Sequence, residues 1–469
     1  MMPTLTPEIL AAHRDLSLAS RQFVEAAADH PEWLLPLDYR KNTVEPIPEI
    51  LDDYSYPLQV WPTLIDGERV REIEAAIAGI AELVKLIPER IFGWDPAAIG
   101  RYYGIGDANE IAILFEPPNS LAHMAFRPDF FFSEEGLRFL ETNFSPRLGG
   151  WNLRFWEATC RRNPAIAGFL QDHGLTPKYR DPLRALFAHL LRTALAAGFG
   201  REGEIHLAFI APTPERSWRA GQGALFDRVL TEVRQELAPG LGGSIAFAAY
   251  PEDFEARRGC LYLGDGRRVD VVYEFSRPGK PQELGRIAKA GKFQLYNGPL
   301  SGLLTDKRNF ALLSESLGTG RFDRREEGLI ESLVPWSRNL IERPVEYRGE
   351  RSGLRDLVLG RRERFVIKKG QSFEGRDVVV GKYTDEDSWR RAVDEAFAEG
   401  SWLAQEHVAS RPYLYQAGER GTAVHEVVWG TFGFGTAYGG AFLRLAPRGS
   451  GDGVINSKRG ASEGLVFEV

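Results

Sequence analysis

The stretch Arg127–Pro146, RPDFFFSEEGLRFLETNFSP, predicts a β-hairpin in which charged and amide side chains share one face. Two segments rich in aromatic and aliphatic residues flank Glu134-Glu135-Gly136. These residues suit a three-residue turn, because glycine readily takes the left-handed conformation that such a turn requires.

The predicted turn fixes how the two strands pair. It pairs Ser133 with Leu137, and the register that follows places Asp129 opposite Glu141. Because strand side chains alternate with period two, both carboxylates point to the same face.

Two residues further from the turn, the same register places Arg127 opposite Asn143. These side chains share the face of the two carboxylates. Phe130 and Leu140 are expected to point to the other face.

Carboxylates directly opposed on neighbouring strands repel each other and weaken the pairing. A hard divalent cation reverses the sign of that interaction, and oxygen ligands from Asp129, Glu141 and Asn143 suit magnesium. The alternative is a surface hairpin with a solvated polar face, and the hairpin alone favours neither interpretation.

The content of 43% hydrophobic residues indicates a globular protein. Its 469 residues are too many for one ordinary hydrophobic core, so the chain is expected to form more than one domain. The net charge of −7 gives no broad electrostatic case for nucleic acid or an anionic membrane. Cys160 and Cys260 lack the spacing of a metal or redox motif. With no signal peptide and no apolar run of membrane-spanning length, the sequence predicts a soluble, cytoplasmic protein without nucleic-acid or membrane partners.

The chain divides into four predicted regions. Residues 1–100 form a helical N-terminal region, in which Thr6-Pro7-Glu8 starts one helix and Val70–Ile87 forms another that Pro88 ends. Residues 101–200 contain the hairpin and, before it, the apolar run Glu110–Glu116, which predicts a buried strand.

Residues 201–300 alternate strand and helix patterns and predict a compact βαβ domain. The segments that carry the pattern are Ile205–Ile210, Ala224–Leu237, Ser244–Tyr250 and Val269–Phe275. The Gly-x-x-x-x-Gly-Lys-Ser/Thr phosphate loop is absent from the sequence, so a nucleotide would require another architecture.

Residues 301–469 contain two lysine-bearing segments that are candidates for binding phosphate. Lys307 lies at the start of an expected helix, where a lysine is usually solvated. Arg364–Lys369 and Asp377–Tyr383 predict two strands joined by the flexible turn Gly370–Gly375. A lysine-bearing strand followed by such a turn can cover a triphosphate with its ammonium and backbone N–H groups, although an ordinary hairpin has the same pattern.

The next segment pairs a helix with a strand. Thr384 and Asp387 predict a capping box for a helix that Gly400 ends. The strand Trp402–Val408 follows, and its end can offer backbone and carboxylate partners to an adenine.

Together, Arg127-x-Asp129, Glu141-x-Asn143 and the lysines of the later segments resemble a circularly permuted ATP-grasp ligase of the glutathionylspermidine-synthetase-like kind. The Glu-x-Asn strand closes the unpermuted domain, whereas here it precedes the lysines. The resemblance covers residues 125–150 and 295–465. It implies an α+β or α/β fold with an ATP-grasp core, a βαβ domain of the pre-grasp kind and a helical N-terminal region.

The resemblance also implies residue roles. Asp129, Glu141 and Asn143 correspond to magnesium ligands, and Arg127 and Arg444 to catalytic contacts. The implied ATP-binding residues are Lys307, Lys368, Gln371, Gly375, Gln405, Glu406 and Val408. Lys369 could replace Lys368, and Arg448 or Arg459 could replace Arg444.

The implied activity is that of an ATP-dependent carbon–nitrogen ligase that forms an amide or peptide bond through an acylphosphate. ATP and Mg²⁺ would be its cofactors, and a small carboxylate and an amine, such as an amino acid, peptide or polyamine, its substrates. A small-molecule kinase on the same fold and a nucleotide-binding regulatory protein without turnover are the alternatives.

Overall fold

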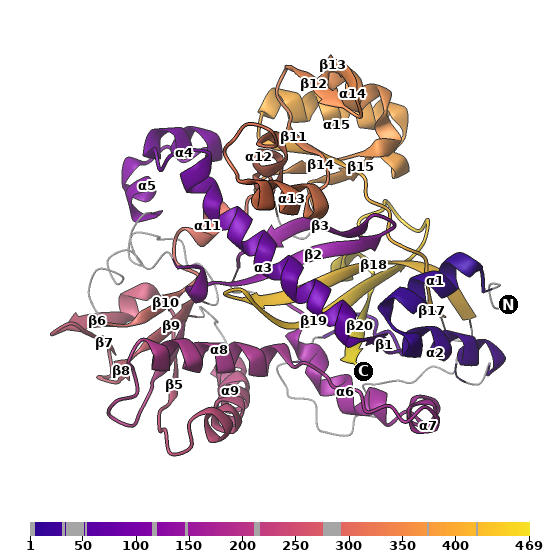
Figure 1. Cartoon of the computed structure of the whole chain (residues 1–469). Coiled ribbons are helices and arrows are strands. Elements are labelled where there is room, and N and C mark those ends of the chain that lie inside the picture. The colour runs from indigo at the N-terminus through magenta and orange to yellow at the C-terminus, as the bar shows by residue number, and fades with distance from the viewer. Residues whose placement is uncertain are drawn as a thin grey trace.

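The computed structural model shows a mixed α/β protein with several sheets (Figure 1). It describes residues 5–30, 33, 51, 54–114, 120–145, 149–210, 216–274, 292–372, 375–418 and 421–469. Within these ranges, segments distant in sequence meet in one large central sheet.

The central sheet joins the early hairpin to the last strands of the chain. Its strand order is β1-β20-β19-β18-β2-β3, with β17 pairing to β18. The strands are β1 (Thr63–Ile65), β2 (Ala125–Ser133), β3 (Gly136–Asn143), β17 (Tyr413–Ala417), β18 (Gly421–Phe434), β19 (Ala437–Pro447) and β20 (Ser462–Glu468). The predicted helical region therefore also contributes a strand, β1, to this sheet.

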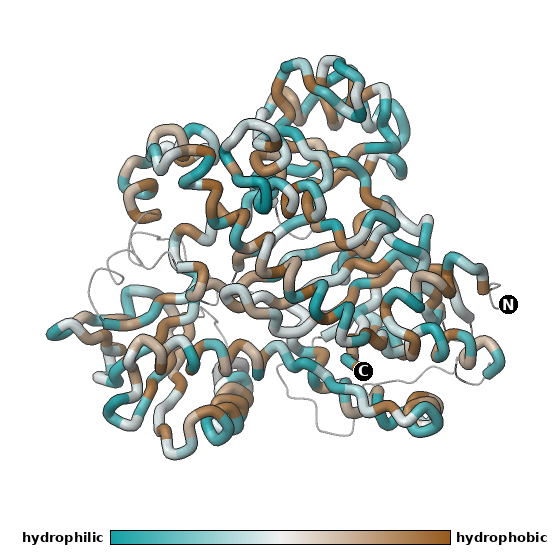
Figure 2. Tube along the Cα trace, in the orientation of Figure 1, coloured by the Kyte–Doolittle hydropathy of each residue, from teal (hydrophilic) through white to brown (hydrophobic). Residues whose placement is uncertain are grey.

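Helix α3 (Gly67–Arg90) crosses the central sheet (Figure 1). Asp66 caps its start by accepting hydrogen bonds from the backbone N–H groups of the first turn. Apolar and polar residues interleave along the helix, and the apolar ones form its buried face (Figure 2). Pro88 lies inside the last turn and does not end the helix, so that prediction was wrong by two residues.

The N-terminal helices α1 (Pro7–Leu16) and α2 (Leu18–Asp29) are joined to the sheet through a buried histidine. Thr6 caps α1, as predicted. The Nδ1 atom of His13 lies 2.9 Å from the Ser20 hydroxyl, and its Nε2 accepts a hydrogen bond of 3.0 Å from the Leu414 amide in β17. His13 thus connects three elements by two hydrogen bonds.

A second sheet has the order β10-β9-β4-β5, and all of its pairs are parallel. Its strands are β4 (Leu207–Ile210), β5 (Ile245–Ala248), β9 (Val271–Glu274) and β10 (Gln294–Tyr296). Helix α9 (Arg216–Leu237) connects β4 to β5 and gives the predicted βαβ unit. Helix α8 (Pro182–Ala196) packs against both α9 and the central sheet. A small sheet of β6 (Phe254–Arg257), β7 (Cys260–Leu263) and β8 (Arg268–Val269) extends from this part.

The third layer is a small lobe with its own core. Its sheet has the order β11-β16-β14-β15, formed by β11 (Ser337–Asn339), β16 (Trp402–Glu406), β14 (Phe365–Lys369) and β15 (Val378–Val380). Around it lie α12 (Asn309–Glu315), α14 (Leu354–Gly360), α15 (Glu386–Glu399) and the hairpin of β12 (Pro344–Tyr347) and β13 (Glu350–Gly353). The small lobe stands over the β2–β3 hairpin (Figure 1).

The remaining helices connect these layers. They are α4 (Pro96–Tyr103), α5 (Ala108–Leu114), α6 (Arg154–Arg161), α7 (Pro164–Asp172), α11 (Ser301–Leu304) and α13 (Arg324–Leu333). None of the helices in the described ranges is both long and apolar enough to cross a membrane.

Two local predictions were wrong. The expected strand Glu110–Glu116 is helix α5 as far as Leu114, and its last two residues lie outside the described ranges. Its buried residues Ile111 and Leu114 are three apart, which suits one helix face. Helix α15 is capped by Asp385, whose carboxylate accepts from the Ser388 amide, and not by Thr384.

Lys307 does not begin a helix. It lies in the turn between α11 and α12, and its amide donates to the Gly370 carbonyl at 3.0 Å. The Asp306 carboxylate binds the Arg308 guanidinium at 2.7 Å, which holds this turn. As a result Lys307 is buried rather than solvated.

Acidification should destabilise the protein partly through His13. Burial lowers its pKa to about 3. The unfolded chain therefore binds the proton first as pH falls below the ordinary value, and about 2 kcal/mol is lost between pH 6.5 and 5. Urea unfolding of His13→Gln should show a loss smaller by that amount, whereas equal losses in both proteins would contradict this role.

Candidate functional site

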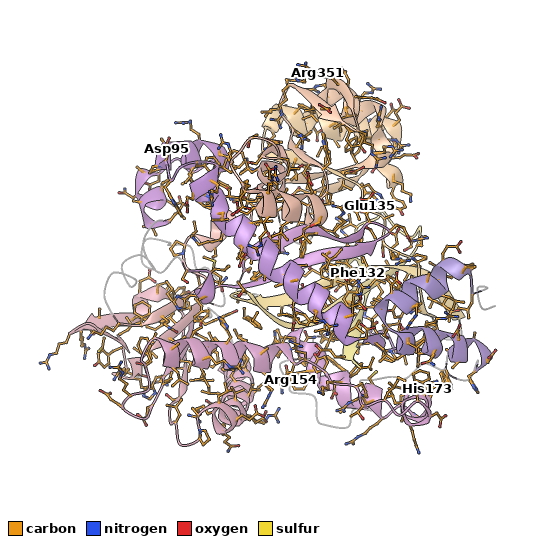
Figure 3. All side chains as sticks on the ribbon, in the orientation of Figure 1. Asp95, Phe132, Glu135, Arg154, His173 and Arg351 are labelled. Carbon is orange, nitrogen blue, oxygen red and sulfur yellow. The ribbon has the colours of Figure 1, made fainter. Side chains whose placement is uncertain are left out.

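The hairpin has a shorter turn than predicted but retains the predicted pairs of the site. Ser133 pairs with Gly136, not with Leu137, so the turn contains two residues. Gly136 has a positive φ of 98°. Figure 3 labels Glu135 at this turn.

A β-bulge restores the register. Between the pairs Phe130–Phe139 and Asp129–Glu141, strand β3 contains one additional residue, Leu140. A bulge places two residues of one strand against one of its partner. Beyond it, the carboxylates oppose each other as predicted.

The bulge also reorients Leu140. The residue lines a cavity together with Asp129 and Glu141, while Phe130 lies in the large hydrophobic core. The prediction that Leu140 shares the face of Phe130 was therefore wrong. Its carbonyl accepts a hydrogen bond of 3.1 Å from the Lys368 ammonium.

The cavity lies between the central sheet and the small lobe, has a volume of about 120 Å³ and opens to solvent. The predicted site residues that line it are Asp129, Glu141, Lys368, Gly375, Gln405, Glu406, Val408 and Arg444. They come from both sides of the cavity.

Three other predicted residues contact these. The Lys307 ammonium lies 3.4 Å from Glu141 Oε2 and donates to the Ser372 carbonyl. Asn143 donates from Nδ2 to Glu141 Oε1 at 3.0 Å, and Arg127 Nε lies 3.3 Å from Asp129 Oδ1.

The turn Gly370–Gly375, predicted as a lid over a triphosphate, is only partly brought to the cavity. Gly375 lines it, whereas Gln371 is exposed and does not. Residues 373–374 of the predicted lid lie outside the described ranges.

Buried charges of both signs meet at one end of the cavity. Arg444 Nη2 lies 2.7 Å from Asp129 Oδ2, and both side chains are more than nine-tenths buried. Burial opposes the charge of Arg444, but the charge and hydrogen bond of Asp129, with the charges of Glu141 and Glu463, together raise the arginine pKa. The ion pair therefore helps to keep Arg444 charged inside the protein.

Burial and neighbouring charges also shift the pKa values of Glu141 and Lys368. Burial alone would raise the pKa of Glu141, but the charge of Lys307, the Asn143 hydrogen bond and the charge of Lys368 lower it far below its ordinary value. Burial and the nearby Lys307 lower the pKa of Lys368 to about 8, against the opposing effect of Glu141.

The geometry distinguishes the alternative cations that the sequence left open. Lys369 points away from the cavity and binds Glu399 at 2.5 Å. Arg448 donates to the Ser410 carbonyl at 2.9 Å, and Arg459 binds Asp452 and the Gly375 carbonyl. Lys368 and Arg444 are the members of these sets that line the cavity.

The cavity also has an apolar lining. This lining is Phe131, Leu140, Val366, Val378, Val380, Val408, Val428, Val454 and Ile455. At the end of β16, the amides of Glu406 and His407 donate to the carbonyls of Trp336 and Arg364. The amide of Val408 is the next one along the chain.

The Glu406 carboxylate is used within the small lobe. It accepts hydrogen bonds of 2.7 Å from the Tyr347 hydroxyl and from Arg348. Because Tyr347 and Arg348 already bind the Glu406 carboxylate, the prediction that this carboxylate binds an adenine is not favoured. The other group that the sequence offered at this strand end is the backbone.

Several lining residues were not predicted, notably Glu426, Val428, Ile455 and Asn456. Alternation along β18 places Glu426 and Val428 on the face of Gly430, which pairs with Asp129. The alternation of side chains along this strand can be read from the sequence. The identity of the strand that pairs with β18 cannot.

The donor set fits a magnesium ion. Asp129 Oδ1 is buried and has the Arg127 ion pair but no hydrogen-bond partner, and Glu141 faces the cavity from the directly opposed position. Asn143 adds an amide oxygen on the same strand. Within the described ranges, groups of three or more His, Cys, Asp or Glu arranged for a metal are absent, and the present set contains only two carboxylates.

Comparison with known proteins leaves the family open. No family model and no curated protein matches the sequence. Among solved structures, the chain is similar to one titled "Putative gamma-glutamylcysteine synthetase" from Methylobacillus flagellatus KT. The two are 12% identical, the TM-score is 0.37, and the match covers 82% of this chain and 86% of that one. This TM-score does not establish a shared fold.

The Asp129–Arg444 pair should show strong energetic coupling. Asp129→Asn or Arg444→Met alone leaves a buried charge without its partner and should cost about 3–5 kcal/mol of unfolding free energy. The double variant removes both charges and should lose about 1–3 kcal/mol less than the sum. Urea unfolding of the three variants measures this, and strictly additive losses would show that the pair does not interact.

Proposed function

We propose that the cavity binds ATP with Mg²⁺ and that the protein is an ATP-dependent carboxylate–amine ligase with a circularly permuted ATP-grasp core. The observation that carries the proposal is the convergence of Arg127, Lys307, Lys368 and Arg444 on the opposed carboxylates Asp129 and Glu141. Cations outnumber carboxylates there, so a triphosphate with a bound metal ion would be accommodated electrostatically.

The lining of the cavity supports a nucleotide. Beside its charged residues the cavity has apolar ones that could contact an adenine ring, and β16 would supply the Glu406 carbonyl and the Val408 amide as adenine contacts. The phosphates would lie against Lys307 and Lys368, beneath the Gly375 turn.

The chain order supports the permutation. The hairpin β2–β3 precedes the lysines by more than a hundred positions but pairs with β18, near the end of the chain. In the unpermuted order the Glu-x-Asn strand closes the domain, so it would follow the lysines instead of preceding them.

The chemistry would consist of two transfers. An oxygen of the substrate carboxylate attacks the γ-phosphorus of ATP, ADP leaves, and an acylphosphate forms. The amine then attacks the acyl carbon, loses a proton and displaces phosphate, which leaves an amide. Such transfers depend mainly on positioning and on charge neutralisation.

Each charged residue has a place in this scheme. Arg127 and Arg444 would neutralise charge on the transferred phosphoryl group. Asp129, Glu141 and Asn143 would hold Mg²⁺, which supplies Lewis-acid neutralisation of the phosphates. The substrates would be a small carboxylate and an amine, such as an amino acid, a peptide or a polyamine, in a cytoplasmic setting.

The first test is the role of Glu141. Glu141→Ala removes the carboxylate opposed to Asp129, and we expect Mg²⁺-dependent ADP formation to fall at least about a hundredfold, the scale of one electrostatic contact in catalysis. Glu135→Ala, the same change at the exposed turn of this hairpin, is the matched control and should retain activity. Melting temperatures establish that both variants fold.

The assay supplies a panel of amino acids, amines and short peptides and measures ADP, phosphate and product mass. A product that joins two substrates identifies a ligase, and a phosphorylated single substrate identifies a kinase. Binding of ATP without turnover across the panel would favour a regulatory nucleotide-binding protein. ADP formation by Glu141→Ala at the wild-type rate would refute the proposed site.

A further inference from the structure

The Lys368 ammonium is held by two acceptors from different parts of the protein. The Gln405 side-chain carbonyl accepts from it at 2.7 Å, and the Leu140 backbone carbonyl at 3.1 Å. Gln405 belongs to the small lobe, whereas Leu140 is the bulge residue of the central sheet. The ammonium thus bridges the two sides of the cavity.

The orientation of the Gln405 amide is fixed by chemistry. An ammonium group can only donate, so the oxygen of the amide must face Lys368. The amide nitrogen then lies 3.3 Å from the hydroxyl oxygen of Ser337, directly opposite on β11. That hydroxyl donates its own hydrogen to the Pro335 carbonyl at 2.9 Å and so presents a lone pair to the amide.

This chain of hydrogen bonds is enclosed. Gln405 is 1% exposed and Ser337 is fully buried. Buried polar groups of this kind keep their partners, because breaking a hydrogen bond without water nearby costs the full desolvation penalty. The buried Gln405–Ser337 hydrogen bonds therefore fix the position of the Lys368 ammonium from the side of the small lobe.

We propose that Gln405 is a positioning residue for Lys368 and not an adenine contact. An ammonium group has three N–H bonds. With two directed at Gln405 and Leu140, the third is left for a group in the cavity, and the proposed function identifies that group as a phosphate oxygen of ATP. This inference rests on the proposed function, and it makes more specific the ATP-binding role that the resemblance implies for Gln405.

Both ends of the Gln405 side-chain amide are already occupied, by Lys368 and by Ser337. An adenine could bind it only after one of these buried bonds broke. Gln405 should therefore affect how the protein holds the phosphates and leave its contact with the base unchanged.

Calorimetric binding of three probes separates the two roles. Gln405→Met keeps the length of the side chain but removes the acceptor. We expect affinity for Mg²⁺-ATP and for tripolyphosphate to fall by one common factor, roughly tenfold or more for a lost hydrogen bond to a charged group. Affinity for adenosine should stay within about twofold of the wild type.

A double-variant comparison shows whether the effect passes through Lys368. Lys368→Met alone should weaken tripolyphosphate binding, and adding Gln405→Met to it should weaken binding no further. Additive losses in the double variant would overturn the inference. So would Gln405→Met binding that falls for adenosine but not for tripolyphosphate.

Two outcomes are kept apart by the design. If the wild type binds neither ATP nor tripolyphosphate, the proposed function fails and the inference falls with it. If it binds both but Gln405→Met does not show the phosphate-specific loss, only the inference fails. Should Gln405→Met not fold, Ser337→Ala is the second variant. Roughly threefold weaker tripolyphosphate binding with unchanged adenosine binding supports the inference, and unchanged tripolyphosphate binding overturns it.

Discussion

The site depends on one constraint: each charged side chain buried in it must lie beside a group of opposite charge. Asp129 and Arg444 are both more than nine-tenths buried, and an isolated charge there would be costly. Their pairing joins β2 to β19, two strands separated by most of the chain, with β18 between them. The same condition brings Lys307 and Lys368 toward Glu141. The mutual compensation of these groups thus holds together segments that have no sequence proximity.

Local patterns in the sequence predicted the hairpin, its opposed carboxylates and the strand that carries Lys368, because each depends on residues close together in the chain. Pairing between β2 and β18 could not be predicted in this way, since strand alternation identifies a face but not a neighbour. Turn length was ambiguous for a similar reason, because two-residue and three-residue turns both accept glycine near Gly136. The strand predicted over Glu110–Glu116 failed because a short apolar run also fits a buried helix face.

Side-chain competition accounts for the other differences. Glu406 could have served an adenine, but Tyr347 and Arg348 bind its carboxylate from a hairpin that the sequence did not place beside it. Lys307 was expected at a solvated helix start, and the Asp306–Arg308 ion pair instead shapes a buried turn. In both places a partner distant in sequence or a turn held by side chains decided the outcome.

The short turn and the Leu140 bulge together constrain which insertions and deletions this hairpin can accept during evolution. One residue fewer at the turn and one residue more in β3 cancel, so the strands beyond the bulge remain in step. An insertion at the turn by itself would turn the acidic face of β3 to the opposite side of the sheet, because side chains alternate. Paired with loss of the bulge residue, the same insertion would leave Asp129 and Glu141 facing each other. Length changes in this hairpin should therefore occur as compensating pairs, much as a second frameshift restores a reading frame.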